Sequence, residues 1–277
     1  MRTFTQVDVF TDELLFGNPV AVVHDADGLS TEQMAAFARW TNLSETTFLL
    51  TPTDPAADYR LRIFTTAREL PFAGHPTLGS ARAWLEAGGT PQTDGQLVQE
   101  CGAGLVSLRA KGSRLAFAAP PLLRDGPVSP STLEAVAASL GIAPGEVVDA
   151  QWADNGPGWV AVLLTDADAV LALAPDPAAF GEYPTVGVVG PYPPGADADF
   201  EIRAFVADDA FFEDPVTGSL NAAIAQWLIP AGEAPSTYTA SQGAKLDRRG
   251  RVHIEQSGDG IWVGGDTVIG ITGTVNL

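Results

Sequence analysis

The sequence is poor in cysteine and lysine, and each shortage excludes certain kinds of bond or binding partner. Cys101 is the single cysteine among 277 residues, so no disulfide can form within the chain. Lys111 and Lys245 are the only lysines, whereas Asp and Glu number 34 and the formal net charge is -19. An acidic excess of this size repels phosphate backbones and anionic lipid, so we expect neither nucleic acid nor a membrane as a partner.

Several sequence features that define large protein classes are also missing. No run approaches the ~18 apolar residues of a membrane-spanning helix. The opening residues lack the apolar stretch of a secretory signal, so we expect a cytoplasmic protein. The sequence has neither G-x-G-x-x-G nor a P-loop, and no Cys/His cluster has zinc spacing. The pattern G-x-S-x-G is absent around Ser219, which argues against an α/β hydrolase.

The residues that are present predict an α/β protein in two halves. Strand-like segments and helices alternate over residues 1–118, where Ser30 and Gln33 have the spacing of a capping box at the start of a helix. Residues 119–130 contain four prolines and a glycine, which predicts a connector. The order then begins again over residues 131–266, with a second capping box predicted at Ser131.

One segment of the first half recurs in the second. YRLRIFT at 59–65 resembles FEIRAFV at 200–206. Each segment leads through a loop into a glycine and a polar residue where a helix is predicted to start, at Gly74–His75 and at Gly218–Ser219. The shared order favours duplication of one unit, and independent use of the same strand–loop–helix pattern is the alternative.

The two predicted helix starts indicate where an anion would bind. A helix N-terminus presents backbone N–H groups without partners and a partial positive charge, and it binds carboxylate without a lysine. Glycine at each start, Gly74 and Gly218, lets the backbone approach a ligand closely. Two such termini facing one cleft would form a local anion site despite the acidic surface.

Polar residues near these starts are candidates for acid–base chemistry. His75 has the side chain best suited to titrate near neutral pH, or it caps its helix. Asp214 precedes a proline among apolar residues, which suits either a carboxyl of raised pKa or a turn residue. Glu45 stands directly before an apolar strand and is either a general base or an ordinary solvated acid. Ser219 is either functional or simply a residue that starts a helix.

The motifs together resemble the PhzF-like family of phenazine-biosynthesis isomerases along the whole chain. The resemblance depends on short motifs: FGNPVAVV at 16–23, LSETTF at 43–48, PFAGHPTLGSA at 71–81, EDPVTGS at 213–219, SQG at 241–243 and the closing GGDTVIGITGTV. It implies a diaminopimelate-epimerase-like fold, with two pseudo-symmetric halves that each wrap a sheet around a central helix. The last strand, about 267–277, would return to the first half.

The resemblance also implies an activity. The family isomerises a dihydro-hydroxyanthranilate by proton movement, without metal or organic cofactor, and is generally dimeric. Glu45 matches the family base, and His75, Asp214 and Ser219 match the residues that move protons and hold the substrate carboxylate. Ser44 and the backbone N–H groups of Gly74 and Gly218 would contribute to substrate binding.

Two departures limit what the resemblance implies. Related racemases carry a cysteine at each helix start, where this chain has His75 and Ser219, so racemisation by two thiols is disfavoured. The run LDRRGRV at 246–252 differs from the family pattern after SQG, which leaves the substrate open. The leading hypothesis is an isomerase for a small unsaturated carboxylic acid. The alternatives are an epimerase or racemase of an amino or hydroxy acid with non-thiol bases, and a non-enzymatic binding protein.

Overall fold

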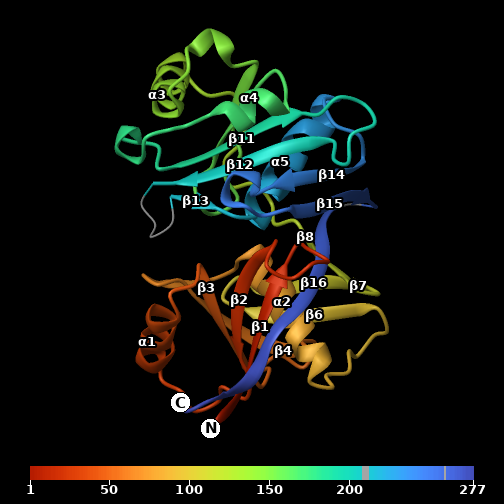
Figure 1. The fold of residues 1–277 in the computed structure, drawn as a ribbon. Helices are drawn as coiled ribbons and strands as arrows, with labels where there is room; N and C mark the ends of the chain where they lie inside the picture. The colour runs from red at the N-terminus through yellow and green to blue at the C-terminus, as the bar shows by residue number, and fades with distance from the viewer. Residues whose placement is uncertain (208–211, 259) are drawn as a thin grey trace. The chain divides into compact units, whose positions relative to one another are not determined.

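The computed structural model describes residues 1–207, 212–258 and 260–277, and the chain divides into two compact units (Figure 1). Unit 1 comprises Met1–Ala118 and Gly264–Leu277, and unit 2 comprises Ala119–Val263. The proline-rich segment 119–130 belongs to unit 2, where isolated backbone bridges join it to Gln151 and Asp154.

Unit 1 is a ring of strands. Its hydrogen-bonded order is β1-β2-β3-β4-β6-β7-β8-β16, and β16 pairs again with β1. The strands are β1 Arg2–Val9, β2 Asn18–Val23, β3 Glu45–Leu50, β4 Tyr59–Phe64, β5 Glu69–Leu70, β6 Gln96–Cys101, β7 Gly104–Lys111, β8 Arg114–Ala118 and β16 Gly260–Val275, of which the part from Gly264 onward belongs to unit 1. The pairing of β16 with β1 is antiparallel, from Thr267 opposite Val9 to Val275 opposite Arg2.

One helix fills the ring of unit 1. Helix α2, Gly74–Glu86, contacts β1, β2, β3, β4 and β8, and its residues 74–81 are all buried. Gly79 allows this close fit, because a Cβ there would lie 2.3 Å from Cγ1 of Val20. Helix α1, Thr31–Thr41, packs outside through Met34 and Phe37. Strands β2 and β3 are almost continuously buried, without the alternation of buried and exposed residues that is typical of a strand with one solvated face.

Unit 2 is an open sheet with helices on both faces. The strand order is β9-β10-β11-β12-β14-β15, with β13 paired to β12. The strands are β9 Asp149–Trp152, β10 Val160–Leu163, β11 Thr185–Pro191, β12 Phe200–Val206, β13 Glu213–Asp214, β14 Thr237–Gln242 and β15 Gly250–Ser257. The helices are α3 Pro130–Leu140, α4 Ala167–Ala172 and α5 Gly218–Ala231, with 3-10 turns η1 Pro144–Glu146, η2 Pro177–Ala179 and η3 Ala244–Leu246.

Small residues set the packing of the unit 2 sheet. Leu220 of α5 lies over Gly187, where a Cβ would be 2.2 Å from the leucine Cδ1. Gly190 lies against α4, where a Cβ would be 2.3 Å from the backbone oxygen of Asp166. The two glycines therefore let α5 and α4 approach the backbone of β11 closely. On the α4 side, an apolar core that includes Phe205 joins the sheet to α3 and α4.

The repeated segments form the same local structure in both units. In unit 1, Arg62 of β4 pairs with Glu69 of β5, with Nη2 2.6 Å from Oε2. In unit 2, Arg203 of β12 pairs with Glu213 of β13 at 2.8 Å. Each arginine also lies over the phenylalanine two residues later, 5.1 Å and 4.8 Å from the ring centroids. The arginine in each unit therefore anchors the short strand that precedes the central helix.

One local prediction differs in detail from the structure. The capping box at Ser30 is confirmed, but helix α3 is capped by Ser129 rather than Ser131, because Pro130 favours the first helical position and Ser129 Oγ accepts from Thr132 N. Cys101 is half-buried. Among the described residues, no helix is long and apolar enough to cross a membrane.

Candidate active site

Three elements of unit 1 begin next to one another and bring three polar side chains together. Asn18 is the first residue of β2, Glu45 the first of β3, and His75 the second of α2. Strands β2 and β3 are parallel, with Val20 opposite Glu45, so both start at the same end of the sheet. The structure thus brings together Glu45 and His75, which are 30 residues apart in the sequence.

His75 lies between the other two side chains. Its Nε2 is 3.3 Å from Oε2 of Glu45, and its Nδ1 is 3.4 Å from Nδ2 of Asn18. The histidine is only 5% exposed, and burial lowers its pKa to about 3. The imidazole is therefore neutral at physiological pH, and its contact with Glu45 joins a neutral ring to a carboxylate rather than forming an ion pair.

A tight loop fixes the position of Asn18. The carboxylate of Asp8 accepts hydrogen bonds from the backbone N–H of Leu15 at 2.7 Å and of Gly17 at 3.2 Å. Gly17 packs against β1 so closely that a Cβ would lie 2.2 Å from the backbone oxygen of Val9. The FGNP motif thus turns the chain sharply into β2 and holds Asn18 fully buried.

The start of α2 has no side chain that caps it. Ala73 is the N-cap residue and makes no side-chain bond, and the first turn contains no acidic residue. His75 lies inside the helix with its ring directed to Glu45 and Asn18, so it does not cap α2. Gly74 is buried at the first helical position, and Ser44 is partly buried just before β3. The first turn therefore keeps the N–H character that suits an anion.

The other predicted residues gather at the start of α5 in unit 2. Asp214 ends β13 opposite Ala204, and its Oδ2 accepts a hydrogen bond of 2.6 Å from the hydroxyl of Thr217. Gly218 and Ser219 are the first two residues of α5, and Thr217 is its N-cap residue. The hydroxyl oxygen of Ser219 accepts a hydrogen bond of 3.1 Å from the indole N–H of Trp159.

Gln242, a residue that sequence reasoning did not place in the site, holds this loop. Its Oε1 accepts from Thr217 N at 3.0 Å and from Asn221 Nδ2 at 3.0 Å. Its Nε2 donates to the backbone oxygen of Asp214 at 3.1 Å and to the hydroxyl of Thr217 at 2.9 Å. The side chain is 1% exposed. The SQG motif is therefore explained by its contact with DPVTGS, since Gln242 satisfies four polar groups around one helix start.

Gly243 completes the contact between the two motifs. Its φ is +95°, and a Cβ at this position would lie 2.6 Å from the backbone oxygen of Pro215. Both the backbone conformation and the lack of space require glycine. Asn18 lies in FGNPVAVV and Gln242 lies in SQG, two of the motifs that carry the family resemblance. These motifs point to both residues, whereas the spacing of residues in the sequence does not.

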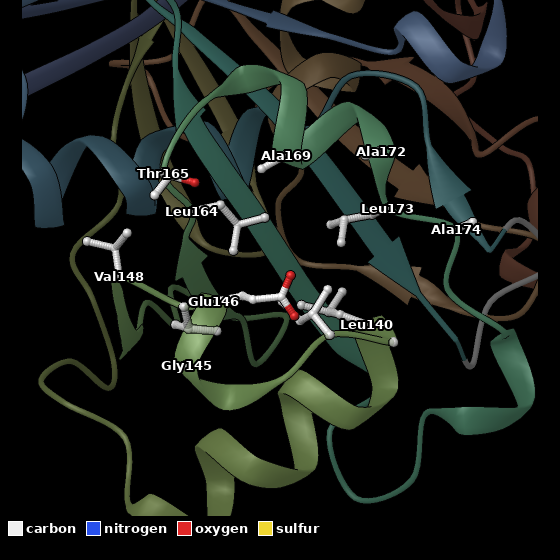
Figure 2. Close-up of a pocket in the computed structure, with 13 residues that line it drawn as sticks. Leu140, Gly145, Glu146, Val148, Leu164, Thr165, Ala169, Ala172, Leu173 and Ala174 are labelled. Carbon is white, nitrogen blue, oxygen red and sulfur yellow. The ribbon is translucent and has the colours of Figure 1, made fainter.

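The pocket of unit 2 lined by α3, α4 and η1 contains none of the predicted site residues. It has a volume of about 710 Å³, which is large enough for a small molecule, and its walls are mostly apolar (Figure 2). Glu146 projects into it, but Oε2 of this residue accepts a hydrogen bond from Ala143 N at 2.7 Å. In the described part of the chain, no group of three or more His, Cys, Asp or Glu residues is placed to hold a metal ion.

Comparison with known proteins gives the family. The model of the phenazine biosynthesis-like proteins, PhzC-PhzF, matches residues 7–273. Antisense-enhancing sequence 1 of Schizosaccharomyces pombe is 37% identical and covers 98% of both chains. The trans-2,3-dihydro-3-hydroxyanthranilate isomerase of Pseudomonas aeruginosa is 34% identical, covering 94% of this chain and 92% of its own.

Solved structures agree with this assignment. A PhzF-family protein of Enterococcus faecalis superposes with a TM-score of 0.81 at 26% identity, covering 100% of this chain and 99% of its own. The predicted α/β fold of the diaminopimelate-epimerase type is confirmed. The chain therefore belongs to the phenazine biosynthesis-like family, PhzC-PhzF, and is an isomerase.

Proposed function

We propose that the chain moves a proton on a small unsaturated carboxylic acid that resembles dihydro-hydroxyanthranilate. The observation that carries the proposal is the contact between Glu45 and His75 at the start of α2. It places a carboxylate beside a neutral imidazole at a helix N-terminus. This combination supplies a base next to a group that attracts anions, in a chain whose relatives include named isomerases of this substrate class.

Glu45 is the base in this proposal. It removes a proton from a carbon that the neighbouring unsaturation and carboxyl group make acidic, and the resulting charge is delocalised in the substrate. His75 contacts Glu45 at 3.3 Å and helps to position it. General bases of this kind typically contribute about 10²–10⁴-fold to the rate.

Asp214 and Ser219 supply proton transfer and carboxylate binding at the start of α5 in unit 2. Ser219 accepts from Trp159, which leaves its own hydroxyl hydrogen to donate to a substrate carboxylate. The first N–H groups of α5 and α2 bind the same type of anion. Asp214, which Thr217 and Gln242 position, serves the second proton position or a departing hydroxyl. Ser44 contributes to binding near Glu45.

The test uses trans-2,3-dihydro-3-hydroxyanthranilate in deuterated water. We expect a change in ultraviolet absorbance as the double bond moves and deuterium at one carbon of the product. Glu45→Gln should lower turnover by at least about 10²-fold, because it removes the base with little change in size. Glu86→Gln is the matched control. This residue lies at the exposed end of α2, with 58% of its side chain accessible, and its variant should keep wild-type turnover.

Other outcomes would select other functions. Solvent deuterium incorporated with inversion at one carbon, and no double-bond shift, would indicate an epimerase. Tight binding of the acid without exchange during long incubation would indicate a binding protein. Wild-type turnover by Glu45→Gln would remove Glu45 from its role while leaving the family assignment intact.

We also propose that the enzyme needs no metal or organic cofactor and acts as a homodimer. Turnover should then survive dialysis against EDTA without loss. Light scattering coupled to size-exclusion chromatography should give about twice the chain mass of 28.9 kDa. A monomer that turns over at the same rate would contradict the dimer without affecting the reaction.

A further inference from the structure

The imidazole of His75 touches a different polar group through each of its nitrogens. Nε2 lies 3.3 Å from Oε2 of Glu45, and Nδ1 lies 3.4 Å from Nδ2 of Asn18. Asn18 is 0% exposed and His75 is 5% exposed, so water does not supply alternative partners freely. A neutral ring carries one N–H, and these two contacts decide which nitrogen holds it.

The carboxylate determines the proton position. The contact lies outside hydrogen-bond geometry, but the negative charge of an ionised Glu45 at 3.3 Å favours an N–H over a lone pair on the nitrogen that faces it, and this nitrogen is Nε2. Nδ1 is then a lone pair that needs a donor, and the amide NH₂ of Asn18 supplies it. With the amide turned around, its oxygen would require a hydrogen on Nδ1, and a bare Nε2 would then face the carboxylate. The two contacts therefore agree on a single tautomer.

We propose that Asn18 is a positioning residue that locks His75 in the Nε2–H tautomer, directed at Glu45. Resting on the proposed function, this directs the ring N–H of His75 toward the carboxylate of the base, 3.3 Å away. It also keeps the acceptor nitrogen of the ring occupied by Asn18, so His75 does not receive the substrate proton.

The lock differs from simple packing in what it predicts. A buried asparagine that only fills space would be replaced by leucine with no effect on the ring proton. An asparagine that donates to Nδ1 cannot be replaced by leucine without such an effect, because leucine leaves the Nδ1 lone pair without a partner. Aspartate reverses the demand, since its carboxylate accepts and favours a hydrogen on Nδ1.

The experiment reads the tautomer directly from ¹⁵N chemical shifts of histidine-labelled protein without substrate at pH 7. The chain has three histidines, so the spectrum is simple, and the signal that His75→Asn removes identifies the ring. We expect wild type to show a protonated Nε2 and an unprotonated Nδ1. Asn18→Leu should give a mixture of tautomers, and Asn18→Asp should protonate Nδ1. Asn42→Asp, at the exposed C-cap of α1 in the same unit, is the matched charge control and should leave the His75 shifts unchanged.

A wild-type ring protonated at Nδ1, or doubly protonated at pH 7, would overturn the proposal even if no Asn18 variant folds. Unchanged His75 shifts in a folded Asn18→Leu protein would overturn it as well. Turnover is read separately: we expect Asn18→Leu to lower kcat more than it raises KM. The expected tautomer combined with full activity of Glu45→Gln would refute the proposed function and leave the lock standing.

Discussion

Acidification should destabilise unit 1, and the structure sets the share that His75 contributes. In the unfolded chain the imidazole has an ordinary pKa near 6.5, whereas burial in the folded unit lowers the pKa to about 3. Between pH 3 and pH 6.5 the imidazole is protonated in the unfolded state and neutral in the folded state. The stabilisation from neutral His75 is therefore complete above about pH 6.5 and is lost as the pH falls toward 3.

The size of the loss follows from the separation of the two pKa values. Each unit of separation corresponds to about 1.4 kcal/mol, so between pH 7 and pH 5 this one group should cost about 2 kcal/mol of unfolding free energy. His24 has a pKa that burial also lowers, so the whole protein should lose more than this. The contribution of His75 is isolated by comparison with His75→Asn, which has no titrating group at that position.

Urea unfolding at pH 7, 6 and 5 measures the effect. Tryptophans lie in both units, so amide resonances of unit 1 should be followed rather than total fluorescence. The difference in unfolding free energy between wild type and His75→Asn should shrink by about 2 kcal/mol from pH 7 to pH 5. His75→Gln, which differs in size, should give the same pH dependence. A difference that is constant with pH would show that the ring titrates normally in the folded state, and the described burial would be wrong.

Three substitutions test the packing that supports the site, each by urea unfolding. Gly243→Ala should cost about 2 kcal/mol, because alanine disfavours φ of +95° and its Cβ would meet a backbone oxygen at 2.6 Å. Gly79→Ala should cost about 1–3 kcal/mol from overpacking against Val20, more than the gain of about 1 kcal/mol in helix propensity, and adding Val20→Ala should restore stability. Glu213→Ala should cost about 3–5 kcal/mol because it leaves Arg203 buried and unpaired, whereas Arg203→Met with Glu213→Leu should cost less.

The features that were predicted well from the sequence are those that depend on residues close together in the chain. The capping box at Ser30 needs only four residues, and helix starts at Gly74 and Gly218 follow from a glycine before an apolar periodic run. The cap of α3 was misplaced by two residues because Ser129 and Ser131 both satisfy the local pattern. Pro130, whose ring suits the first helical position, decides between them.

The features that sequence reasoning missed depend on contacts between distant segments. Gln242 reaches Thr217, 25 residues earlier, and Asn18 reaches His75, 57 residues later. No periodicity encodes such pairs, because which strand lies beside which helix is decided by the whole sheet. Family motifs located both residues but gave no reason for them. The reason is geometric, since each amide partners a polar group at or beside a helix start that would otherwise be buried without one.

The repeated segments of the two units share a backbone arrangement but carry different polar side chains. In both units an arginine of the central strand anchors a two-residue strand, and the chain then enters a buried helix through glycine. The side chain after that glycine differs: His75 in unit 1 contacts a carboxylate, and Ser219 in unit 2 contacts an indole. Backbone N–H groups without helical partners are thus present at the starts of both α2 and α5, whereas the pair of Glu45 and His75 is present in unit 1 alone among the described residues. The two helix starts therefore share the means of binding an anion and differ in the side chains available for acid–base chemistry.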